Sequence, residues 1–237
     1  MKKTKIDRSI DTEALGFQVR ESYKTARTNI AYSIFKKGCK KVAFTSSTKG
    51  EGKTVTSINV ASALAQQVGT KVIVVECDLR RPRVNTALKI TPTPGLTNYL
   101  NEECSLDDIV KDTKIENLKA ITYGAIPPNP SELLASESMF DLIKTLEKNY
   151  DYIIFDTPPI GVVIDALPIM KESDGVVIIA RNNSTTYPEL SRTVEVIKRT
   201  NAKILGVILN RVKPHETRKG KSYYSRYGGY YKASAND

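Results

Sequence analysis

Histidine and cysteine are scarce in this sequence, and long hydrophobic runs are missing. His215 is the single histidine of 237 residues, which argues against histidine-based catalysis and against a histidine-ligated metal. The three cysteines are odd in number and share no short spacing, so we expect neither a disulfide framework nor a zinc site at Cys39, Cys77 or Cys104. No apolar run approaches the ~18 residues that span a bilayer, and no signal peptide is recognised. We therefore expect a cytoplasmic protein.

Positive charge, in contrast, is in excess. The chain has 36 Lys and Arg against 26 Asp and Glu, a net charge of +10. Such an excess suggests an anionic partner, namely nucleic acid, a membrane surface or a phosphorylated ligand. The 40% of hydrophobic and 26% of charged residues are ordinary for a globular protein, and the length allows one domain with short arms. This composition excludes a disordered chain, a collagen-like chain and a disulfide-rich mini-protein.

Short β-branched runs alternate with longer helical patterns through most of the chain. The runs are nearly continuous in apolar residues, which is typical of strands covered on both faces. We predict strands at 41–46, 71–78, 118–123, 151–156, 175–181 and 202–210, and helices at 54–69, 136–150 and 187–200. Alternation of this kind predicts an α/β fold with a doubly wound, mostly parallel sheet and helices on both sides.

Two arms flank this core, which we place at residues 41–212. In residues 1–40, one helical stripe predicts an amphipathic helix that packs on the core or on a neighbour; its members are Leu15, Val19, Ala26, Ile30 and Ile34. Residues 213–237 lack apolar periodicity and are predicted to be a disordered tail. Five tyrosines fall within nine residues of that tail: Tyr223, Tyr224, Tyr227, Tyr230 and Tyr231.

The segment SSTKGEGKT at 46–54 follows a predicted strand and opens a predicted helix, as a Walker A phosphate-binding loop does. Gly50 and Gly52 let the backbone turn its N–H groups toward phosphate oxygens. The Lys53 ammonium can reach the β- and γ-phosphates, and the Thr54 hydroxyl can ligate Mg²⁺. Ser47 replaces the first glycine of the motif, so the match is incomplete. The predicted ATP-binding residues are Thr48, Lys49, Gly50, Glu51, Gly52, Lys53, Thr54 and Val55.

Acidic residues end two of the predicted strands. Glu76 and Asp78 close the run KVIVVECD, where strand alternation would point both the same way, and Asp156 closes DYIIFD. In open α/β sheets, ligands bind outside the carboxyl ends of the strands, which brings these carboxylates near Thr54. Asp156 would then hold Mg²⁺, directly or through water. A helix cap or a turn is the alternative for each carboxylate taken alone.

These features together resemble the bacterial tyrosine kinases that accompany capsule and exopolysaccharide synthesis, which have a P-loop NTPase fold with deviant Walker motifs. The similar segments are the SSTKGEGKT loop, ECDLRRP, DTPP, the tyrosine-rich tail and ESYKTARTNI at 21–30. In the last segment, Glu21 and Arg27 match the family's oligomerisation motif, and Lys24 stands where arginine is usual, without its planar fork. The resemblance implies a homo-oligomer, which is expected to be a ring.

The resemblance also implies an ATP- and Mg²⁺-dependent protein-tyrosine kinase with Lys53, Glu76 and Asp78 as catalytic residues. Glu76, in place of the family's aspartate, would activate the tyrosine hydroxyl, and Asp78 would help Thr54 and Asp156 to hold Mg²⁺. One extra methylene moves a carboxylate by about an ångström, and a misplacement of that size can cost ~10²-fold in rate. The tail tyrosines would be autophosphorylated in trans, regulating polysaccharide synthesis and export.

The partners implied are a membrane-anchored activator or chain-length regulator, a cognate tyrosine phosphatase and protein substrates. The chain would thus lie at the inner face of the membrane through its activator, and no nucleic acid is expected. Two alternatives remain open: a P-loop ATPase switch of the partition or site-selection type, and a nucleic-acid-binding module. The switch class carries a signature lysine where Thr48 stands here. The tail could also be a merely adhesive low-complexity segment, or stack on single-stranded nucleic acid.

Overall fold

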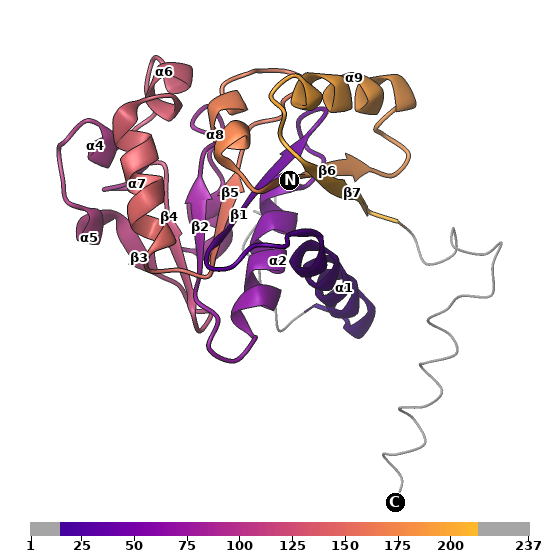
Figure 1. Ribbon diagram of the computed structural model, residues 1–237, viewed down its shortest axis with the longest axis horizontal. Helices are drawn as coiled ribbons and strands as arrows, with labels where there is room; N and C mark the ends of the chain where they lie inside the picture. Colours follow the sequence, from indigo (N-terminus) through magenta and orange to yellow (C-terminus); the bar gives the residue numbers. More distant parts are fainter. Residues whose placement is uncertain (1–14, 213–237) are drawn as a thin grey trace, which may run out of the picture.

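A computed structural model describes residues 15–212, which form one seven-stranded sheet with helices on both faces (Figure 1). The strand order is β3-β4-β2-β5-β1-β6-β7, and every neighbouring pair is parallel except β3 and β4. The strands are β1 (Lys40–Ser46), β2 (Val72–Glu76), β3 (Val110–Asp112), β4 (Leu118–Ile121), β5 (Tyr152–Asp156), β6 (Gly175–Arg181) and β7 (Ile204–Asn210). This confirms the predicted doubly wound α/β sheet.

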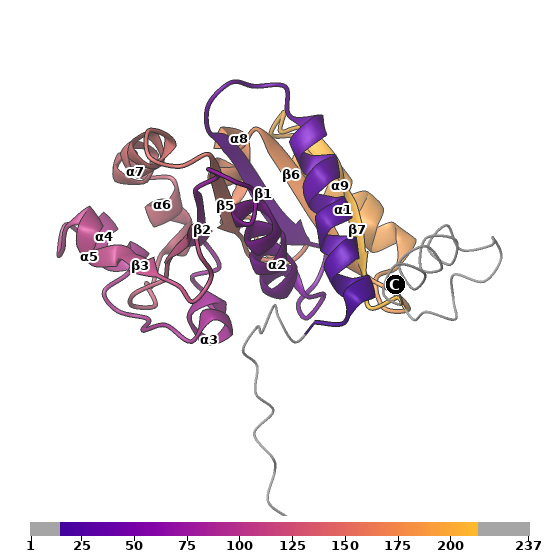
Figure 2. The same cartoon turned by 90° about the horizontal axis from the view of Figure 1, so that it is seen from below.

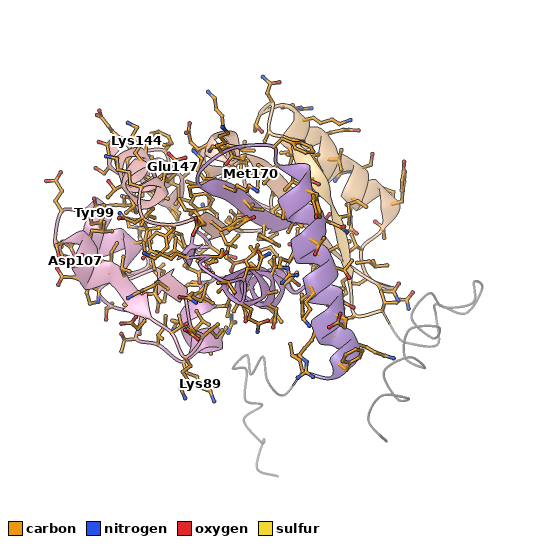
Figure 3. The ribbon with its side chains drawn as sticks, turned by 60° about the horizontal axis from the view of Figure 1, so that its bottom comes forward. Lys89, Tyr99, Asp107, Lys144, Glu147 and Met170 are labelled. Atoms are coloured by element: carbon orange, nitrogen blue, oxygen red, sulfur yellow. The ribbon has the colours of Figure 1, made fainter. Side chains whose placement is uncertain are left out.

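Nine helices belong to the described residues. They are α1 (Phe17–Ser33), α2 (Lys53–Ala65), α3 (Val84–Leu88), α4 (Leu96–Leu100), α5 (Leu106–Ile109), α6 (Pro130–Leu134), α7 (Glu137–Glu147), α8 (Leu167–Glu172) and α9 (Tyr187–Lys198). Tyr99 in α4 and Asp107 in α5 lie at the end of the molecule remote from α1 (Figure 3). Within residues 15–212, no helix has both the length and the apolar character that crossing a bilayer requires.

The core has two layers because side chains alternate along each buried strand. In β2, Ile73 and Val75 join the cluster with α7, α8 and α9, whereas Val72 and Val74 join the cluster with α1, α2 and α3. Figure 1 accordingly places α9 on one side of the sheet and α1 and α2 on the other. The apolar runs in the sequence reflect this burial on both faces.

Helix α2 carries the P-loop lysine at its first position and is buried almost throughout. Its small residues, such as Ala61, Ser62 and Ala65, allow close packing against β1, β2 and β5 and against α1. This packing fixes the orientation of α2. Its N-terminus lies at the carboxyl ends of these strands.

Helix α1 packs beside α2 (Figure 2), and Ala26, Ile30 and Ile34 of the predicted stripe pack on the core, whereas Leu15 precedes the helix and Val19 is exposed. Ile30 and Ile34 are buried, whereas the Val19 side chain is 44% exposed. The inner face also includes Tyr23, and Arg27 donates from Nη1 to the Ala63 carbonyl of α2 at 3.2 Å. Tyr23 and Arg27 thus extend the packed face of α1, because a tyrosine ring and an arginine stem can cover apolar surface while their polar ends find partners.

The six predicted strands are confirmed, with ends that differ by up to two residues except at 175–181. The prediction missed β3, whose three residues include Lys111 and Asp112 and have no apolar pattern. It also missed α3, α4, α5, α6 and α8, each of four to six residues. The second predicted strand ends at Glu76 rather than at Asp78, so Asp78 lies in the segment after the strand.

Candidate active site

The candidate site lies at the carboxyl ends of β1, β5 and β2, three adjacent parallel strands. The P-loop follows β1, and Asp156 and Glu76 are the last residues of β5 and β2. In the strand register, Asp156 is paired with Phe44 of β1 and with Glu76 of β2. The topology thus brings the loop and the acidic residues, which are distant in sequence, to one edge of the sheet.

The P-loop has the backbone conformation that its glycines permit. Gly50 and Gly52 have φ angles of 83° and 97°, in the left-handed region that favours glycine. Gly52 directly precedes α2, so the positive end of that helix faces the loop. Ser47 is not among the residues with positive φ, and its side-chain oxygen accepts a hydrogen bond from Thr193 at 2.9 Å. A serine therefore fits where the Walker pattern has its first glycine.

The second residue of α2 contacts the end of β5. The Thr54 hydroxyl donates to Oδ2 of Asp156 at 2.5 Å, and the Ser57 hydroxyl donates to Oδ1 at 3.3 Å. Ser57 lies one helical turn after Thr54, on the same face of α2. A hydroxyl and a carboxylate are hard oxygen donors, so this pair fits an Mg²⁺ ion.

Lys53 and Asp78 form a buried ion pair at the same edge. Lys53 Nζ lies 3.4 Å from Asp78 Oδ2, and both residues are less than a tenth exposed. The lysine therefore has a carboxylate partner within the protein. Phosphate oxygens would compete with Asp78 for the ammonium group.

Glu76 is not part of this ion pair and has backbone partners instead. Its Oε2 accepts hydrogen bonds from the backbone N–H groups of Arg83 and Val84, at 2.8 and 2.7 Å, at the start of α3. Its Oε1 lies 3.3 Å from the N–H of Asp78. Strand β2 ends at Glu76, so the alternation on which the sequence expectation relied does not extend to Asp78, and the two side chains have different partners.

Burial and mutual repulsion raise the pKa values of two of these carboxyl groups. Burial raises the pKa of Asp156 to about 6, against the attraction of Lys53 and the hydrogen bonds from Thr54 and Ser57. Burial also raises the pKa of Glu76 well above its usual value, and Asp156 adds to that effect. A cation bound at this edge would favour the charged forms and lower both pKa values.

The donor set fits a metal that is shared with a ligand. Among residues 15–212, no group of three or more His, Cys, Asp or Glu side chains is arranged to hold a metal ion by itself. Mg²⁺ commonly binds to one or two carboxylates and completes its shell with water and substrate phosphates. Thr54, Asp78 and Asp156 suit that mode, whereas Zn²⁺ would need a closed set of nitrogen or sulfur ligands.

The remaining predicted residues lie in different environments. Lys49 is exposed, the Val55 side chain is 44% exposed on α2, and the Glu51 side chain is buried. In α1, Lys24 forms a 2.8 Å ion pair with Glu21 of the same helix. Arg27 contacts α2, as described above. The tail tyrosines lie outside the described residues.

Several contacts at this edge were missed from the sequence. Arg80 in ECDLRRP forms two hydrogen bonds with the buried carboxylate of Asp165, at 2.5 and 3.2 Å. These bonds tie the segment after β2 to the segment before α8. The two consecutive arginines of ECDLRRP could have suggested a functional contact, but nothing in the sequence pattern identified Asp165 as the partner of Arg80. Thr185 and Asn210, which contact the P-loop from other elements, carried no signal.

Comparisons with known proteins agree with this geometry. A family model described as an AAA domain matches residues 39–207. The chain is 38% identical over 210 residues to tyrosine-protein kinase YwqD of Bacillus subtilis (strain 168), covering 89% of this chain and 85% of that protein. It is 36% identical over 214 residues to tyrosine-protein kinase CpsD of Streptococcus agalactiae, covering 90% of each.

Solved structures show the same likeness. The kinase domain of Escherichia coli tyrosine kinase ETK has a TM-score of 0.81 at 28% identity, over 91% of this chain and 84% of that one. The chimerical protein CapA2B2 has a TM-score of 0.77 at 35% identity, over 81% of this chain and 84% of that one. The cell division ATPase MinD of Pyrococcus furiosus shares the fold, with a TM-score of 0.63 at 24% identity. Since the curated relatives match 89–90% of its length, the chain belongs to the bacterial tyrosine-protein kinase family and is a tyrosine kinase with a P-loop nucleotide-binding fold.

Proposed function

We propose that this kinase transfers the γ-phosphoryl group of Mg²⁺-bound ATP to tyrosine hydroxyls, including those of its own C-terminal cluster. The observation that supports this best is the meeting of Lys53, Thr54, Asp78 and Asp156 at one edge of the sheet. A cationic donor, a hydroxyl and two carboxylates at a helix N-terminus are the groups that phosphoryl transfer requires.

The chain's own residues would divide the chemistry among them. Lys53 would leave Asp78 to bind phosphate oxygens, and Thr54, Asp78 and Asp156 would hold Mg²⁺. The bound Mg²⁺ would neutralise negative charge on the phosphate oxygens. Gly50 and Gly52 would let backbone N–H groups of the loop contact the phosphates.

Glu76 is proposed to accept the proton of the attacking tyrosine hydroxyl. The new bond joins the tyrosine oxygen to the γ-phosphorus, the bond to the β–γ bridging oxygen breaks, and ADP leaves with that electron pair. The position of Glu76, at the end of β2 and paired in register with Asp156, supports the assignment. Oε2 of Glu76 already accepts two backbone hydrogen bonds, whereas Oε1 accepts only one at 3.3 Å, so Oε1 would accept the proton.

The acceptors are proposed to be Tyr223, Tyr224, Tyr227, Tyr230 and Tyr231 of a neighbouring copy, presented in trans within a homo-oligomeric ring. Phosphorylation would add ~−1.5 to −2 charges per site and loosen the ring by repulsion. A membrane-anchored activator would recruit the chain to the inner face of the membrane, and a cognate tyrosine phosphatase would reset it. In this way the kinase would regulate capsular or exopolysaccharide synthesis and export.

Tyrosine-site mass spectrometry after incubation with ATP and Mg²⁺, with and without the activator's cytoplasmic segment, tests this function. The expected result is phosphate on the tail cluster, and no phosphate there when all five tyrosines are changed to phenylalanine. That variant should still phosphorylate an added protein substrate. ATP hydrolysis without any phosphotyrosine would instead indicate a switch ATPase of the partition type. Phosphate mainly on Tyr23, Tyr99 or Tyr152 would contradict the assignment to the tail.

A further inference from the structure

Glu51, in the middle of the P-loop, has a buried carboxylate with partners on both sides. The residue is 1% exposed. Its Oε2 accepts a hydrogen bond from the backbone N–H of Thr48 at 2.9 Å, and its Oε1 accepts one from the hydroxyl of Thr185. Thr185 lies between β6 and α9, 134 residues away in sequence. The carboxylate thus joins the first half of the loop to a separate segment of the fold.

Thr185 is itself held in place. Its side-chain oxygen accepts a hydrogen bond from the backbone N–H of Arg181, the last residue of β6, at 2.7 Å. A continuous set of hydrogen bonds therefore runs from the end of β6 through Thr185 and Glu51 to Thr48. Since β6 is a central strand paired with β1 and β7, this set anchors the loop to the rigid part of the sheet.

A second contact holds the same residue through its backbone. Asn210, the last residue of β7, donates from Nδ2 to the Glu51 carbonyl oxygen at 2.9 Å. A Cβ atom added at Gly52 would clash with that same nitrogen, so the Asn210 side chain lies directly against the loop at Gly52. The P-loop is therefore restrained at Glu51 from both β6 and β7.

Glu51 is an unusual residue to bury beside a site for phosphate. A carboxylate repels phosphate oxygens, and burying it is costly unless hydrogen bonds compensate. Here those bonds come from the loop and from Thr185, so both carboxylate oxygens have partners within the protein. We propose that Glu51 and Thr185 form a brace that positions the P-loop, and that the Glu51 side chain is a positioning residue rather than a nucleotide ligand.

This inference rests on the proposed ATP site. It also predicts that the Thr185 hydroxyl is needed for full ATP affinity. Without the brace, the N–H groups of the loop would be less well ordered before nucleotide binds, and binding would have to order them. Loss of one hydrogen bond to a charged group should then weaken ATP binding about tenfold. The KM for ATP should rise more than kcat falls, because the chemistry involves Lys53, Asp78 and Asp156.

The test compares Glu51→Gln, Thr185→Val, the double variant and Thr185→Ser by calorimetric titration with ATP and Mg²⁺. An amide offers one acceptor oxygen where the carboxylate offers two, and valine removes the donor. Each single variant should lose about tenfold in affinity, and the double variant should lose no more than either alone. Thr185→Ser keeps the hydroxyl and should bind like wild type. Thr145→Val on α7, whose hydroxyl donates to the Asp141 carbonyl, is the matched control.

Amide hydrogen exchange of residues 46–54 without nucleotide provides a readout that does not depend on ATP. Exchange should be faster in Glu51→Gln and Thr185→Val, and unchanged in Thr145→Val. If Thr185→Val exchanges and binds like wild type while Glu51→Gln is weakened, the brace is refuted. Additive losses in the double variant would refute it as well. A wild-type chain that binds no ATP would contradict the proposed function, and the exchange data would still decide on the brace.

Discussion

The Thr54 hydroxyl donates a 2.5 Å hydrogen bond to Oδ2 of Asp156, joining the start of α2 to the end of β5. Thr54 follows Lys53, whose ammonium group faces Asp78 at 3.4 Å. Two consecutive residues of one helix thus contact carboxylates that follow or end two neighbouring strands. This arrangement links the P-loop to both acidic segments.

Changing Asp156 to Asn should abolish Mg²⁺-dependent tyrosine phosphorylation, with a loss of at least about a hundredfold in kcat. A neutral amide is a poorer ligand for a hard cation than a carboxylate. The measurement is initial-rate kinetics over a range of Mg²⁺ concentrations. Asp174→Asn, at the opposite ends of the strands, serves as the control because its carboxylate pairs with Lys36. Wild-type turnover by Asp156→Asn would exclude this residue as a metal ligand.

The carboxyl group of Asp156 should also make the free energy of unfolding depend on pH. Burial raises its pKa from 3.8 to about 6, so the folded state binds its proton more tightly than the unfolded state does. Its contribution to stability is therefore most favourable below pH 3.8 and is lost as pH rises through 6. At pH 7.5, Asp156→Asn should raise the free energy of unfolding by roughly 1–3 kcal/mol. Urea denaturation at several pH values should show this gain vanish toward pH 4.

Replacing Lys53 with Met should weaken ATP binding by at least about tenfold, because a charge-assisted contact to the phosphates is lost. The variant also leaves Asp78 without its partner, so circular dichroism and thermal unfolding must accompany the titration. Lys198→Met, on the exposed side of α9, is the control for loss of one positive charge. Equal ATP affinity in Lys53→Met and Lys198→Met would show that Lys53 does not bind the nucleotide.

Two substitutions at Glu76 should separate the effect of its side-chain length from the effect of its charge. Glu76→Asp is one methylene shorter and cannot keep both bonds to the N–H groups of Arg83 and Val84. We expect a loss of about 1–2 kcal/mol in stability with activity retained. Glu76→Gln keeps the length but removes the base, so phosphoryl transfer should fall with ATP affinity unchanged. Full turnover by Glu76→Gln would assign the proton acceptor elsewhere.

Helix α1 should respond differently at its outer and inner residues. Glu21 and Lys24 form an exposed pair, and an exposed ion pair contributes about 0–1 kcal/mol, so Glu21→Ala/Lys24→Ala should leave the monomer's stability nearly unchanged. Arg27→Ala removes the contact with Ala63 and should lower stability as well as assembly. Light scattering with nucleotide and activator should report smaller species for both variants. An unaltered assembly in the Glu21→Ala/Lys24→Ala variant would place the interface elsewhere.

Local pattern was sufficient for the larger elements and for the site's location. The apolar runs of β1, β2, β5 and β6 predicted a buried parallel sheet, because only strands covered on both faces need such runs. The glycines and Lys53-Thr54 at a strand–helix junction predicted a phosphate loop, because few sequences suit that turn. In open α/β sheets, ligands bind at the carboxyl ends of the strands. Applied to this predicted sheet and loop, that rule placed Asp156 near Thr54.

The sequence by itself therefore determined the parallel sheet and the P-loop, since both depend on residue type and short-range spacing, whereas the acidic residues meet the loop through the order of the strands. The tertiary structure alone decided which partner each polar side chain found. Glu76 bonds to the start of α3, Glu51 bonds to Thr185 across 134 residues, and α1 turns Arg27 toward Ala63. Hydrogen bonds reach about 3 Å and depend on direction, so they are set by how strands and helices pack, which no local pattern specifies.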